Sequence, residues 1–455
     1  MLSLILASGR QAGFKSEKNK FLHPILGKSM FQQVAETVLS MKPERLYVLL
    51  DRKEDVEEAR KSVRFSRVDF IQPQSQGMKA ILSHWARKTL IREKEKDLLV
   101  VSGDMPLIQP PALKALWSFH RNNGNALTLM ETESRPGCVR IVRLEKGRIK
   151  VIPERQTPSQ TGNSREVSPN LCIIRVRDLL QILPGISGLS KEDESWLAAI
   201  ARVLAGNRKK MDVFSPPSLQ DVFQINNRLD LARAAAVLRD RKIRQLARSG
   251  VTVYDPSSVW IDLDVRIGKD TVLYPSVILE GKTVIGKQCW IYPGAHLTNT
   301  RVGNRVKILS FTVIDGATIE DNVQVGPFAR IRPKTILRSG SKVGNFVEMK
   351  TTDFGRRSKA GHLTYLGDCE IQEDVNIGAG TITCNYDGVK KHKTLVESKA
   401  FIGSGTELVA PLKVGRGAYV GAGSTITKDV SPWSLAVNRG RQIEKTGWAR
   451  RRKKK

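Results

Sequence analysis

A six-residue repeat of aliphatic side chains limits what this chain can fold into more than any other feature of its sequence. Two runs keep the register: Ile267, Leu273, Leu279, Ile285, Ile291 and Leu297, and then Ile402, Leu408, Val414, Val420 and Ile426. Chance does not hold a six-residue register over five consecutive units. The repeat predicts a parallel β-helix, in which each unit is a short strand and a turn and each aliphatic stacks on its equivalent one coil away.

Glycine directly follows many of these aliphatics, as in Ile285-Gly286, Val343-Gly344 and Ile402-Gly403. We expect the Gly, Asn or Asp at such positions to accept the unusual backbone angles of a corner. Three units make one triangular coil of about 18 residues, so residues 251–430 are expected to form about ten coils.

The remaining composition indicates a soluble globular chain of two or three domains. Of its 455 residues 40% are hydrophobic, and its apolar stretches are only as long as a strand, so we expect no transmembrane span. The N-terminus has no basic segment before a long apolar core, which argues against a signal peptide. The cysteines lack CxxC spacing and are interpreted as reduced thiols of a cytoplasmic protein; they are Cys138, Cys172, Cys289, Cys369 and Cys384.

The net charge of +30 raises the question of nucleic acid or an acidic membrane surface as a partner. However, the basic residues are spread along the chain, with one dense cluster at residues 450–455. The sequence contains no recognition helix, zinc-finger spacing or RNP-like aromatic motif. We therefore interpret the cluster as a solvated tail on a protein that handles phosphorylated substrates, and expect no nucleic-acid binding.

The first half of the chain alternates short β runs with helical stretches. Residues 3–6, 46–50 and 98–101 read as buried parallel strands, and residues 30–41 and 111–119 as connecting helices, with Pro111 in a first helical turn. This order predicts a doubly wound α/β sheet. Residues 156–169 read as a polar loop.

Four segments follow from these patterns. Residues 1–226 are expected to form the α/β domain, residues 227–250 a linker helix that Gly250 ends, residues 251–430 the β-helix, and residues 431–455 a basic tail. The fold class is therefore α/β plus all-β.

Residues 358–388 place a His, a Tyr and several Asn inside a repeat that needs only aliphatics and glycines. With FARIRP, GNFVEMK, GHLTYLGD and NYDG around them, the chain resembles the bacterial GlmU family over essentially its whole length. The resemblance implies a left-handed β-helix, a homotrimer, and the two-step synthesis of UDP-N-acetylglucosamine, which feeds peptidoglycan and lipopolysaccharide.

The C-terminal half matches the family domain that transfers acetyl from acetyl-CoA to glucosamine 1-phosphate. By resemblance, His362 is the general base, a role that suits an imidazole titrating near neutral pH, and Glu348 orients it. Cations suit the sugar phosphate; the implied sugar-phosphate contacts are Arg332, Lys350, Tyr365, Asn376 and Lys391. The implied acetyl-CoA contacts are Ala379, Asn385, Tyr386, Ser404, Ala422 and Arg439.

The N-terminal half resembles the family's uridylyltransferase domain, which joins UTP to N-acetylglucosamine 1-phosphate, but its signature is degenerate. The family loop LAAGxGTRM reads LASGRQAGF here, so Gln11, Ala12 and Gly13 replace Gly-Thr-Arg. That loop neutralises the triphosphate. The retained nucleotide and sugar contacts are Leu6, Ala7, Gly9, Lys20, Gln72 and Glu154, and the implied Mg²⁺ ligands are Asp104 and Asn226.

The sugar-binding stretches have also changed. Val139 stands where the family has Gly, Ser168 where it has Asn, and only Glu194 remains of an acidic segment. We therefore expect robust acetyl transfer and weakened uridylyl transfer.

Several alternatives stay open on the sequence alone. One is a monofunctional acetyltransferase with an inactive or redirected nucleotidyltransferase domain. Others are an acyltransferase for another amino sugar, a sugar nucleotidyltransferase of the ADP-glucose type, and a scaffold or nucleic-acid-binding protein built from retired enzyme domains.

Overall fold

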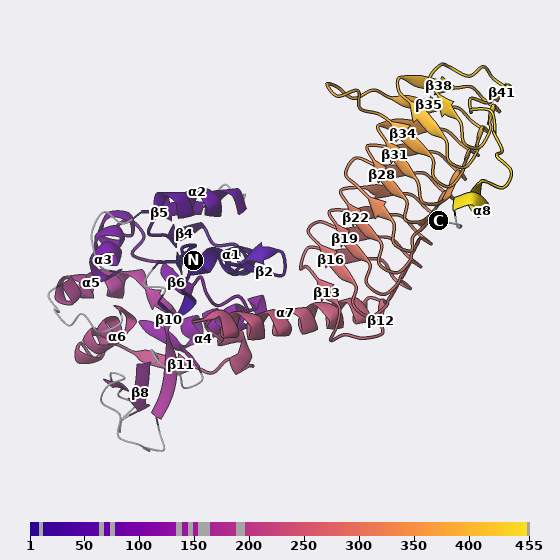
Figure 1. The fold of residues 1–455 in the computed structure, drawn as a ribbon. Helices are drawn as coiled ribbons and strands as arrows, with labels where there is room; N and C mark the ends of the chain where they lie inside the picture. Colours follow the sequence, from indigo (N-terminus) through magenta and orange to yellow (C-terminus); the bar gives the residue numbers. More distant parts are fainter. Residues whose placement is uncertain are drawn as a thin grey trace. The chain divides into compact units, whose positions relative to one another are not determined.

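The computed structural model describes residues 1–8, 12–62, 68–72, 78–132, 139–143, 149–152, 164–187 and 196–452. The chain divides into two compact units, Met1–Leu238 and Arg239–Lys455. Figure 1 shows the first as a sheet with helices and the second as a stack of three-sided coils. Within the described ranges, no helix is both long and apolar enough to cross a lipid bilayer.

The first unit is built on a sheet with the strand order β11-β7-β10-β6-β1-β4-β5. β1 pairs parallel with β4 and β6, and β4 with β5, whereas β10 runs antiparallel to β6 and β7. A hairpin of β8 and β9 extends from β10. The strands are β1 Leu2–Leu6, β4 Arg45–Leu49, β5 Val68–Ile71, β6 Asp97–Ser102, β7 Leu127–Glu131, β8 Val139–Arg143, β9 Ile149–Ile152, β10 Ser164–Arg175 and β11 Met211–Phe214, with β2 Pro24–Ile25 and β3 Lys28–Ser29 forming a separate ribbon.

Helices cover both faces of this sheet. Leu4 of β1 packs in a core with α3, α5 and α6, while its neighbour Ile5 packs in a core with α1, α2 and α4. The doubly wound α/β fold is thereby confirmed. The helices are α1 Met30–Ser40, α2 Lys53–Ser62, α3 Met78–Thr89, α4 Pro110–Asn123, α5 Val176–Ser187 and α6 Trp196–Gly206, and the short 3₁₀ turns are η1 Ala12–Phe14, η2 Lys20–Leu22 and η5 Leu219–Val222.

Two local predictions had different outcomes. Pro111 does lie in the first turn of α4, where a missing backbone N–H costs nothing. The predicted loop over residues 156–169 is wrong in its second part, because residues 164–169 belong to β10. Residues 164–167 pair there with β8, and this strand pairing compensates for a polar sequence of low β-propensity. Residues 156–163 lie outside the described residues.

Helix α7, Arg228–Arg248, contains the division between the two units. After it, Gly250 adopts a φ of +89°, and the Val251 N–H donates to the Leu246 carbonyl at 3.1 Å. A left-handed residue followed by this backward hydrogen bond is a standard helix end, and glycine accepts that φ without strain.

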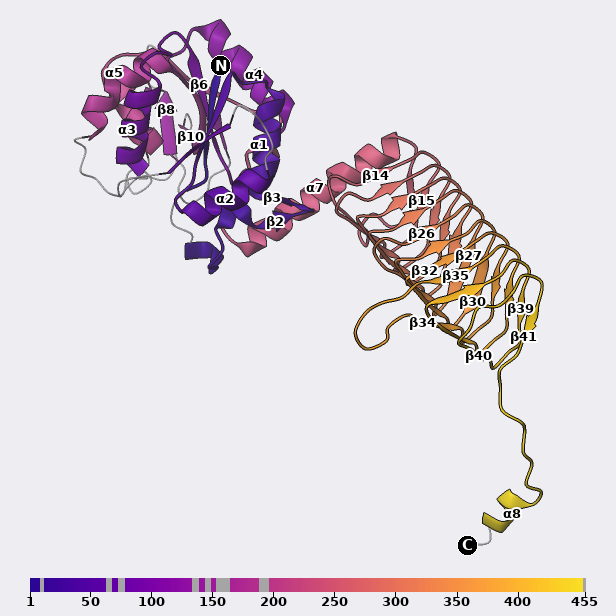
Figure 2. The same cartoon turned by 90° about the horizontal axis from the view of Figure 1, so that it is seen from above.

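The second unit contains three long parallel sheets, one on each side of the coil (Figures 1 and 2). The first sheet holds β12 Thr252–Val253, β15 Val272–Leu273, β18 Trp290–Ile291, β21 Lys307–Ile308, β24 Gln324–Val325, β27 Lys342–Asn345, β30 Lys359–His362, β33 Asn376–Ile377, β36 Phe401–Ile402, β39 Tyr419–Val420 and β41 Leu435–Ala436.

The second sheet holds β13 Trp260–Ile261, β16 Ile278–Glu280, β19 His296–Thr298, β22 Val313–Asp315, β25 Arg330–Ile331, β28 Glu348–Lys350, β31 Tyr365–Gly367, β34 Ile382–Cys384, β37 Glu407–Val409 and β40 Thr425–Ile426. The third sheet holds β14 Arg266–Ile267, β17 Val284–Ile285, β20 Arg301–Val302, β23 Thr318–Ile319, β26 Ile336–Leu337, β29 Asp353–Phe354, β32 Cys369–Ile371, β35 Thr394–Val396 and β38 Leu412–Val414. A short helix, α8 Trp448–Arg452, follows.

The inward residues stack in register from coil to coil, as the repeat predicts. Ile291 pairs with Leu273 below and Ile308 above, and all three are fully buried. The expected left-handed parallel β-helix is therefore the fold of the second unit. The longest insertion lies between Ile377 and Ile402, where the loop of residues 385–393 leaves the coil and projects outward while the two isoleucines still pair (Figure 2).

The glycines beside the aliphatics do not serve the purpose that the sequence suggests. Of the glycines that directly follow an inward Ile, Leu or Val, Gly326 alone has a positive φ. Most of the others permit close contact between coils: a Cβ on Gly344 would lie 1.8 Å from the Gly361 carbonyl oxygen. The expectation of unusual backbone angles at these positions is wrong, because adjacent backbones approach too closely for any side chain.

Larger residues instead hold the left-handed corner positions. Phe311, Phe328 and Phe346 have φ of +57°, +54° and +57°, and their rings stack on one another with centroids 5.2 and 5.5 Å apart. All three rings are about half exposed. This "Phe ladder" marks the corner between the first and second sheets.

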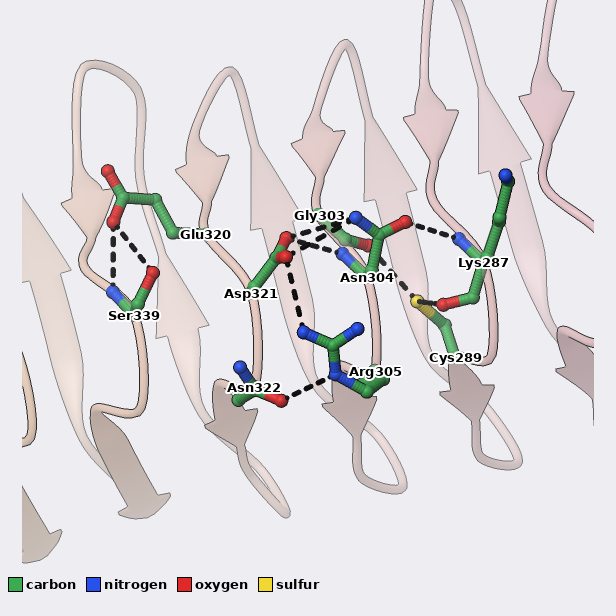
Figure 3. Close-up of polar contacts among 9 residues, drawn as sticks. All are labelled: Lys287, Cys289, Gly303, Asn304, Arg305, Glu320, Asp321, Asn322 and Ser339. Carbon is green, nitrogen blue, oxygen red and sulfur yellow. Dashed lines mark hydrogen bonds and ion pairs between the residues drawn. The ribbon is translucent and has the colours of Figure 1, made fainter.

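The corner between the third and first sheets is joined by polar contacts (Figure 3). The Asp321 carboxylate accepts from the Asn304 N–H at 2.8 Å, and the Arg305 Nε donates to Asn322 at 2.8 Å. The Asn304 N–H is also the main cause of a lowered pKa of Asp321. Each such bond links one coil to the next, so this corner is a structural ladder.

Candidate functional site

One column of corner residues runs along the β-helix between the first and second sheets. Ala360, Ile377, Ile402 and Val420 pair in register and are buried. Two positions after them come His362, Ala379, Ser404 and Ala422, which are therefore stacked one coil apart. The Gly405 N–H donates to the Ala379 carbonyl and the Gly423 N–H to the Ser404 carbonyl, at 2.7 and 2.8 Å. We call these four residues the His362 column.

His362 is exposed, and its ring is oriented by the coil below. Its Nδ1 lies 2.6 Å from the Asn345 Oδ1, and the two residues pair in the strand register. Because an amide oxygen only accepts, Nδ1 carries the proton and Nε2 keeps its lone pair. The Thr364 hydroxyl also donates to the His362 carbonyl at 2.7 Å. The arrangement leaves a base at Nε2, facing solvent.

The expectation that Glu348 orients His362 is wrong in this structure. Glu348 instead accepts from the Arg332 guanidinium at 3.0 Å. The reason is that Glu348 starts a strand of the second sheet directly above Arg330, on the same side as Arg332. Asn345 could have been identified from the sequence as the partner of His362, because it lies one coil before it.

Three cations gather where strands of the second sheet end. Arg332 and Lys350 lie at the ends of neighbouring strands of the second sheet, and Lys391 comes from the projecting loop. Contact with Lys391 lowers the pKa of Lys350, with desolvation as the second cause. Two ammonium groups this close repel one another, so the cluster is suited to a bound anion.

Tyr365 lies one strand above Glu348 on the same sheet. Its hydroxyl reaches over Gly367, since a Cβ on Gly367 would lie 2.4 Å from that oxygen. Gly367 does not have a positive φ, so its role is to give the phenol room. Sequence reasoning missed Gly367.

The projecting loop is braced by its own polar groups. Asp387 accepts from the Val389 and Lys390 N–H groups and contacts the His392 Nε2 at 2.6 Å, and these bonds lower its pKa to about 2. At the base of the loop, the Asn385 amide donates to Asp368 at 2.5 Å. The loop thus holds Lys391 near the cation cluster while Tyr386 stays 60% exposed.

One expected sugar contact, Asn376, lies on a different side of the coil, whereas Arg439 lies beside the His362 column. Asn376 belongs to the first sheet and Tyr365 to the second, so they project from different sides of the β-helix. Arg439 lies near the top of the His362 column, where its Nη1 donates to the Ala422 carbonyl at 3.1 Å.

The N-terminal unit gathers a second polar cluster around Asp104. This carboxylate is 1% exposed and accepts from Lys20 Nζ at 2.5 Å, from Ser102 Oγ at 2.6 Å and from Gln224 Nε2 at 3.2 Å. The Ile225 N–H donates to the Asp104 carbonyl at 3.0 Å, which brings the adjacent Asn226 to the same edge. Lys20, Asp104 and Asn226 are thus brought together.

The altered loop lies against this edge. Phe14 is buried, and the Arg228 Nε donates to its carbonyl at 3.2 Å. A Cβ on Gly13 would lie only 2.6 Å from the Asn226 carbonyl oxygen. Gly13 stands where the family loop carries Arg, so its lack of a side chain is what permits this packing.

The other expected nucleotide contacts are not shown to lie together with Lys20, Asp104 and Asn226. Leu6 and Ala7 are buried at the end of β1, and the Gly103 N–H donates to the Leu6 carbonyl at 2.8 Å. Gln72 is exposed after β5. Gly9 and Glu154 lie outside the described residues, as does Glu194, while Val139 and Ser168 lie in β8 and β10.

A divalent cation would find few protein ligands here. Within the ranges that the structure describes, no group of three His, Cys, Asp or Glu side chains is placed to hold a metal. Both oxygens of Asp104 already accept hydrogen bonds. Mg²⁺ tolerates one or two protein oxygens when phosphates and waters supply the rest. The residues therefore fit a metal that arrives with a nucleotide, once Lys20 turns toward the phosphates.

Comparison with known proteins gives results for both units. Residues 3–253 match the family model of the MobA-like NTP transferase domain. The chain is 36% identical to the "Bifunctional protein GlmU" of Geobacillus sp. (strain WCH70) over 452 residues, which cover 99% of this chain and 97% of that protein. Proteins of the same name from Carboxydothermus hydrogenoformans and Thermotoga maritima are 37% and 36% identical, with 99% and 100% of this chain and 100% of each relative covered.

Proposed function

The chain belongs to the GlmU family, and we propose that it makes UDP-N-acetylglucosamine in the cytoplasm, with acetyl transfer to glucosamine 1-phosphate as the reaction of its second unit. The observations that support this proposal are a base with a free Nε2 and a column of small residues at one corner, and a three-cation cluster where neighbouring strands of the adjoining second sheet end. A base, an anion site and a narrow path for a thioester are what the reaction needs.

In the proposed reaction, His362 Nε2 takes a proton from the ammonium of the sugar. The amine then attacks the thioester carbonyl, so a C–N bond forms, the C–S bond breaks, and the attacking nitrogen releases its second proton to solvent. The protonated imidazole returns its proton to the leaving thiolate. Asn345 fixes the tautomer that makes the first step feasible, because it keeps the proton on Nδ1.

Arg332, Lys350 and Lys391 would bind the sugar phosphate, and Tyr365 would contact the sugar across Gly367. Acetyl-CoA is a substrate that would lie along Ala379, Ser404 and Ala422, with Asn385, Tyr386 and Arg439 at its sides. The small side chains of this column leave room for the pantetheine arm.

For the first unit we propose uridylyl transfer from UTP to N-acetylglucosamine 1-phosphate at a reduced rate. Asp104 and Asn226 would hold Mg²⁺, which would neutralise phosphate charge, and Lys20 would leave Asp104 for the triphosphate. The reduced rate is supported by the loop, which packs Gly13 against Asn226 where the family presents an arginine.

We also propose a homotrimer. Asn376 and Tyr365 project from different sides of one coil, and the half-exposed Phe ladder lies at the corner between those sides. If this corner packs against other copies, Asn376 of one copy can face Tyr365 of another.

Two assays on the purified full-length protein test the proposal. Release of free thiol from acetyl-CoA with glucosamine 1-phosphate measures acetyl transfer, and release of pyrophosphate from UTP with N-acetylglucosamine 1-phosphate measures uridylyl transfer. We expect efficient acetyl transfer and slow uridylyl transfer. Failure of acetyl transfer would overturn the main assignment, and equal efficiency of both steps would overturn the weakened first site. Glucosamine and galactosamine phosphates compared side by side would establish the sugar.

A further inference from the structure

A glutamine that has no part in the proposed reactions lies against the buried carboxylate of the first unit. Gln224 Nε2 donates to Asp104 Oδ2 at 3.2 Å, and Lys20 Nζ contacts the same oxygen at 2.5 Å. The other carboxylate oxygen, Oδ1, accepts from Ser102 Oγ at 2.6 Å. Asp104 is 1% exposed. The oxygen that Lys20 would leave for a triphosphate therefore has a side-chain amide next to it.

The backbone holds this glutamine at the same edge as Asn226. The two residues flank Ile225, which is fully buried and whose N–H donates to the Asp104 carbonyl at 3.0 Å. The Asn226 N–H donates in turn to the Asp230 carboxylate at 3.1 Å. Because the segment is held at both points, only its side chains have to turn when a ligand binds there.

The glutamine amide can serve a carboxylate or a cation, because it carries a donor and an acceptor on one carbon. Toward Asp104 it presents Nε2, since an ionised carboxylate only accepts hydrogen bonds. A half turn of the amide brings Oε1 to the same place. Hard divalent cations bind amide as well as carboxylate oxygens. A cation that replaces the Lys20 ammonium therefore reverses which end of the amide is favoured.

The acidic and imidazole groups of the first unit leave room for such a ligand. Among the residues that the structure describes, His, Cys, Asp and Glu side chains form no group of three that could hold a metal. Asp104 and Asn226 supply only two protein oxygens and one negative charge. An amide already in contact with Asp104 is the nearest further source of an oxygen.

We propose that Gln224 is a third protein ligand of the divalent cation and binds it through Oε1, beside Asp104 and Asn226. This inference rests on the proposed uridylyl transfer. In the unloaded protein the amide steadies the Asp104 carboxylate through Nε2, and it turns when Lys20 moves to the phosphates. A third oxygen helps to retain the metal in a chain whose loop has Gly13 where the family presents an arginine.

The test measures metal binding directly, in the full-length protein with α,β-methylene-UTP, a nucleotide that cannot release pyrophosphate. Electron paramagnetic resonance gives the affinity for Mn²⁺, and displacement of Mn²⁺ gives the affinity for Cd²⁺. Gln224→Leu should weaken Mn²⁺ binding roughly 10- to 100-fold, the range of one lost interaction with a charged group.

A second variant separates a metal ligand from a residue that only orients Asp104. Gln224→Cys places a soft thiolate at the position, so the ratio of Cd²⁺ to Mn²⁺ affinity should rise about tenfold or more above that of wild type. Gln220→Cys is the matched control, because Gln220 is an exposed glutamine of the neighbouring turn η5, and it should leave the ratio unchanged.

Other outcomes overturn the inference. Unchanged Mn²⁺ affinity in Gln224→Leu means that the amide does not reach the metal. An unchanged affinity ratio in Gln224→Cys means that Gln224 serves only as a hydrogen-bond donor to Asp104. If the wild-type protein releases no pyrophosphate from UTP, the proposed uridylyl transfer fails, but Mn²⁺ binding still decides the role of Gln224. Absence of Mn²⁺ binding to wild type with the nucleotide rejects the ligand role.

Discussion

The two units of this chain hold their polar sites in different ways. In the second unit, His362 and the small residues above it occupy equivalent positions of successive coils, so one backbone register places all of them. In the first unit, Lys20, Asp104 and Asn226 come from three separate segments, and contacts between loops bring them together.

This difference indicates how each site tolerates change. A repeat whose coils touch at glycines cannot shift one residue without displacing its neighbours, so its chemistry stays intact or fails as a whole. A loop can exchange Arg for Gly and repack, as residues 12–14 do against Asn226. We therefore expect changes in the column to have the largest effects on activity.

The largest expected effect belongs to His362. His362→Ala should lower the kcat of acetyl transfer by about 10²- to 10⁴-fold, because the ammonium loses its proton acceptor. Uridylyl transfer should be unchanged. His296→Ala is the matched control, since His296 is a histidine of the second sheet that bonds Glu280. Near-normal turnover of His362→Ala would show that another group is the base.

The cluster of Arg332, Lys350 and Lys391 should determine the affinity for glucosamine 1-phosphate. Lys350→Met should raise the KM for glucosamine 1-phosphate roughly 10- to 100-fold, the range of a lost hydrogen bond to a charged group. Lys342→Met, an exposed lysine of β27, should have no effect. An unchanged KM for glucosamine 1-phosphate in Lys350→Met would show that the sugar phosphate does not bind at Lys350.

The same cluster predicts a pH dependence. Lys391 lowers the pKa of Lys350, so Lys350 loses its charge at a lower pH than an ordinary lysine. The KM for the sugar phosphate should therefore rise as the pH passes through that lowered pKa. Lys391→Met removes the repulsion and raises the pKa of Lys350, which should move this rise to higher pH even though the KM itself is larger. An unmoved profile would mean that the two ammonium groups do not interact in solution.

Asn345 should have a smaller effect through His362. Asn345→Ala should lower kcat about tenfold, because a single hydrogen bond that fixes the tautomer is lost. Asn345→Asp should shift the acid limb of the kcat/KM profile to higher pH, since a carboxylate raises the pKa of the neighbouring imidazole. Asn322→Ala, which removes only the structural bond to Arg305, is the control. A purely structural role for Asn345 would leave the limb in place.

The smallest effect on activity is expected in the loop of the first unit, where stability should change instead. Gly13→Ala should destabilise that unit by about 1–3 kcal/mol, because its Cβ meets the Asn226 carbonyl. Calorimetry should show a lower melting temperature for this unit and unchanged acetyl transfer. Gly206→Ala, where a Cβ meets nothing within 4 Å, is the control. Gly13→Arg restores the family residue. Faster uridylyl transfer in that variant would contradict the close packing of Gly13 against the Asn226 carbonyl.

The sequence by itself determined the architecture of both units and the residue types of the second site. Burial of an aliphatic every sixth position has one regular solution, and alternating strands and helices have another, so both folds could be predicted from hydrophobic pattern. The His362 column could also be predicted from the sequence, because residues one coil apart in the repeat must stack. The polar part of β10 could not be predicted, since pairing with β8 outweighs its low β-propensity.

Only the tertiary structure decided which groups contact one another. It gave His362 the amide of Asn345 instead of the carboxylate of Glu348, because the strand register places Asn345 below His362 and turns Glu348 toward Arg332. It also assigned the glycines to close contact between coils and left-handed corners to Phe311 and its neighbours. A one-dimensional pattern records which side of a strand a residue occupies, whereas side-chain contacts depend on distances between coils that are set only when the backbones pack.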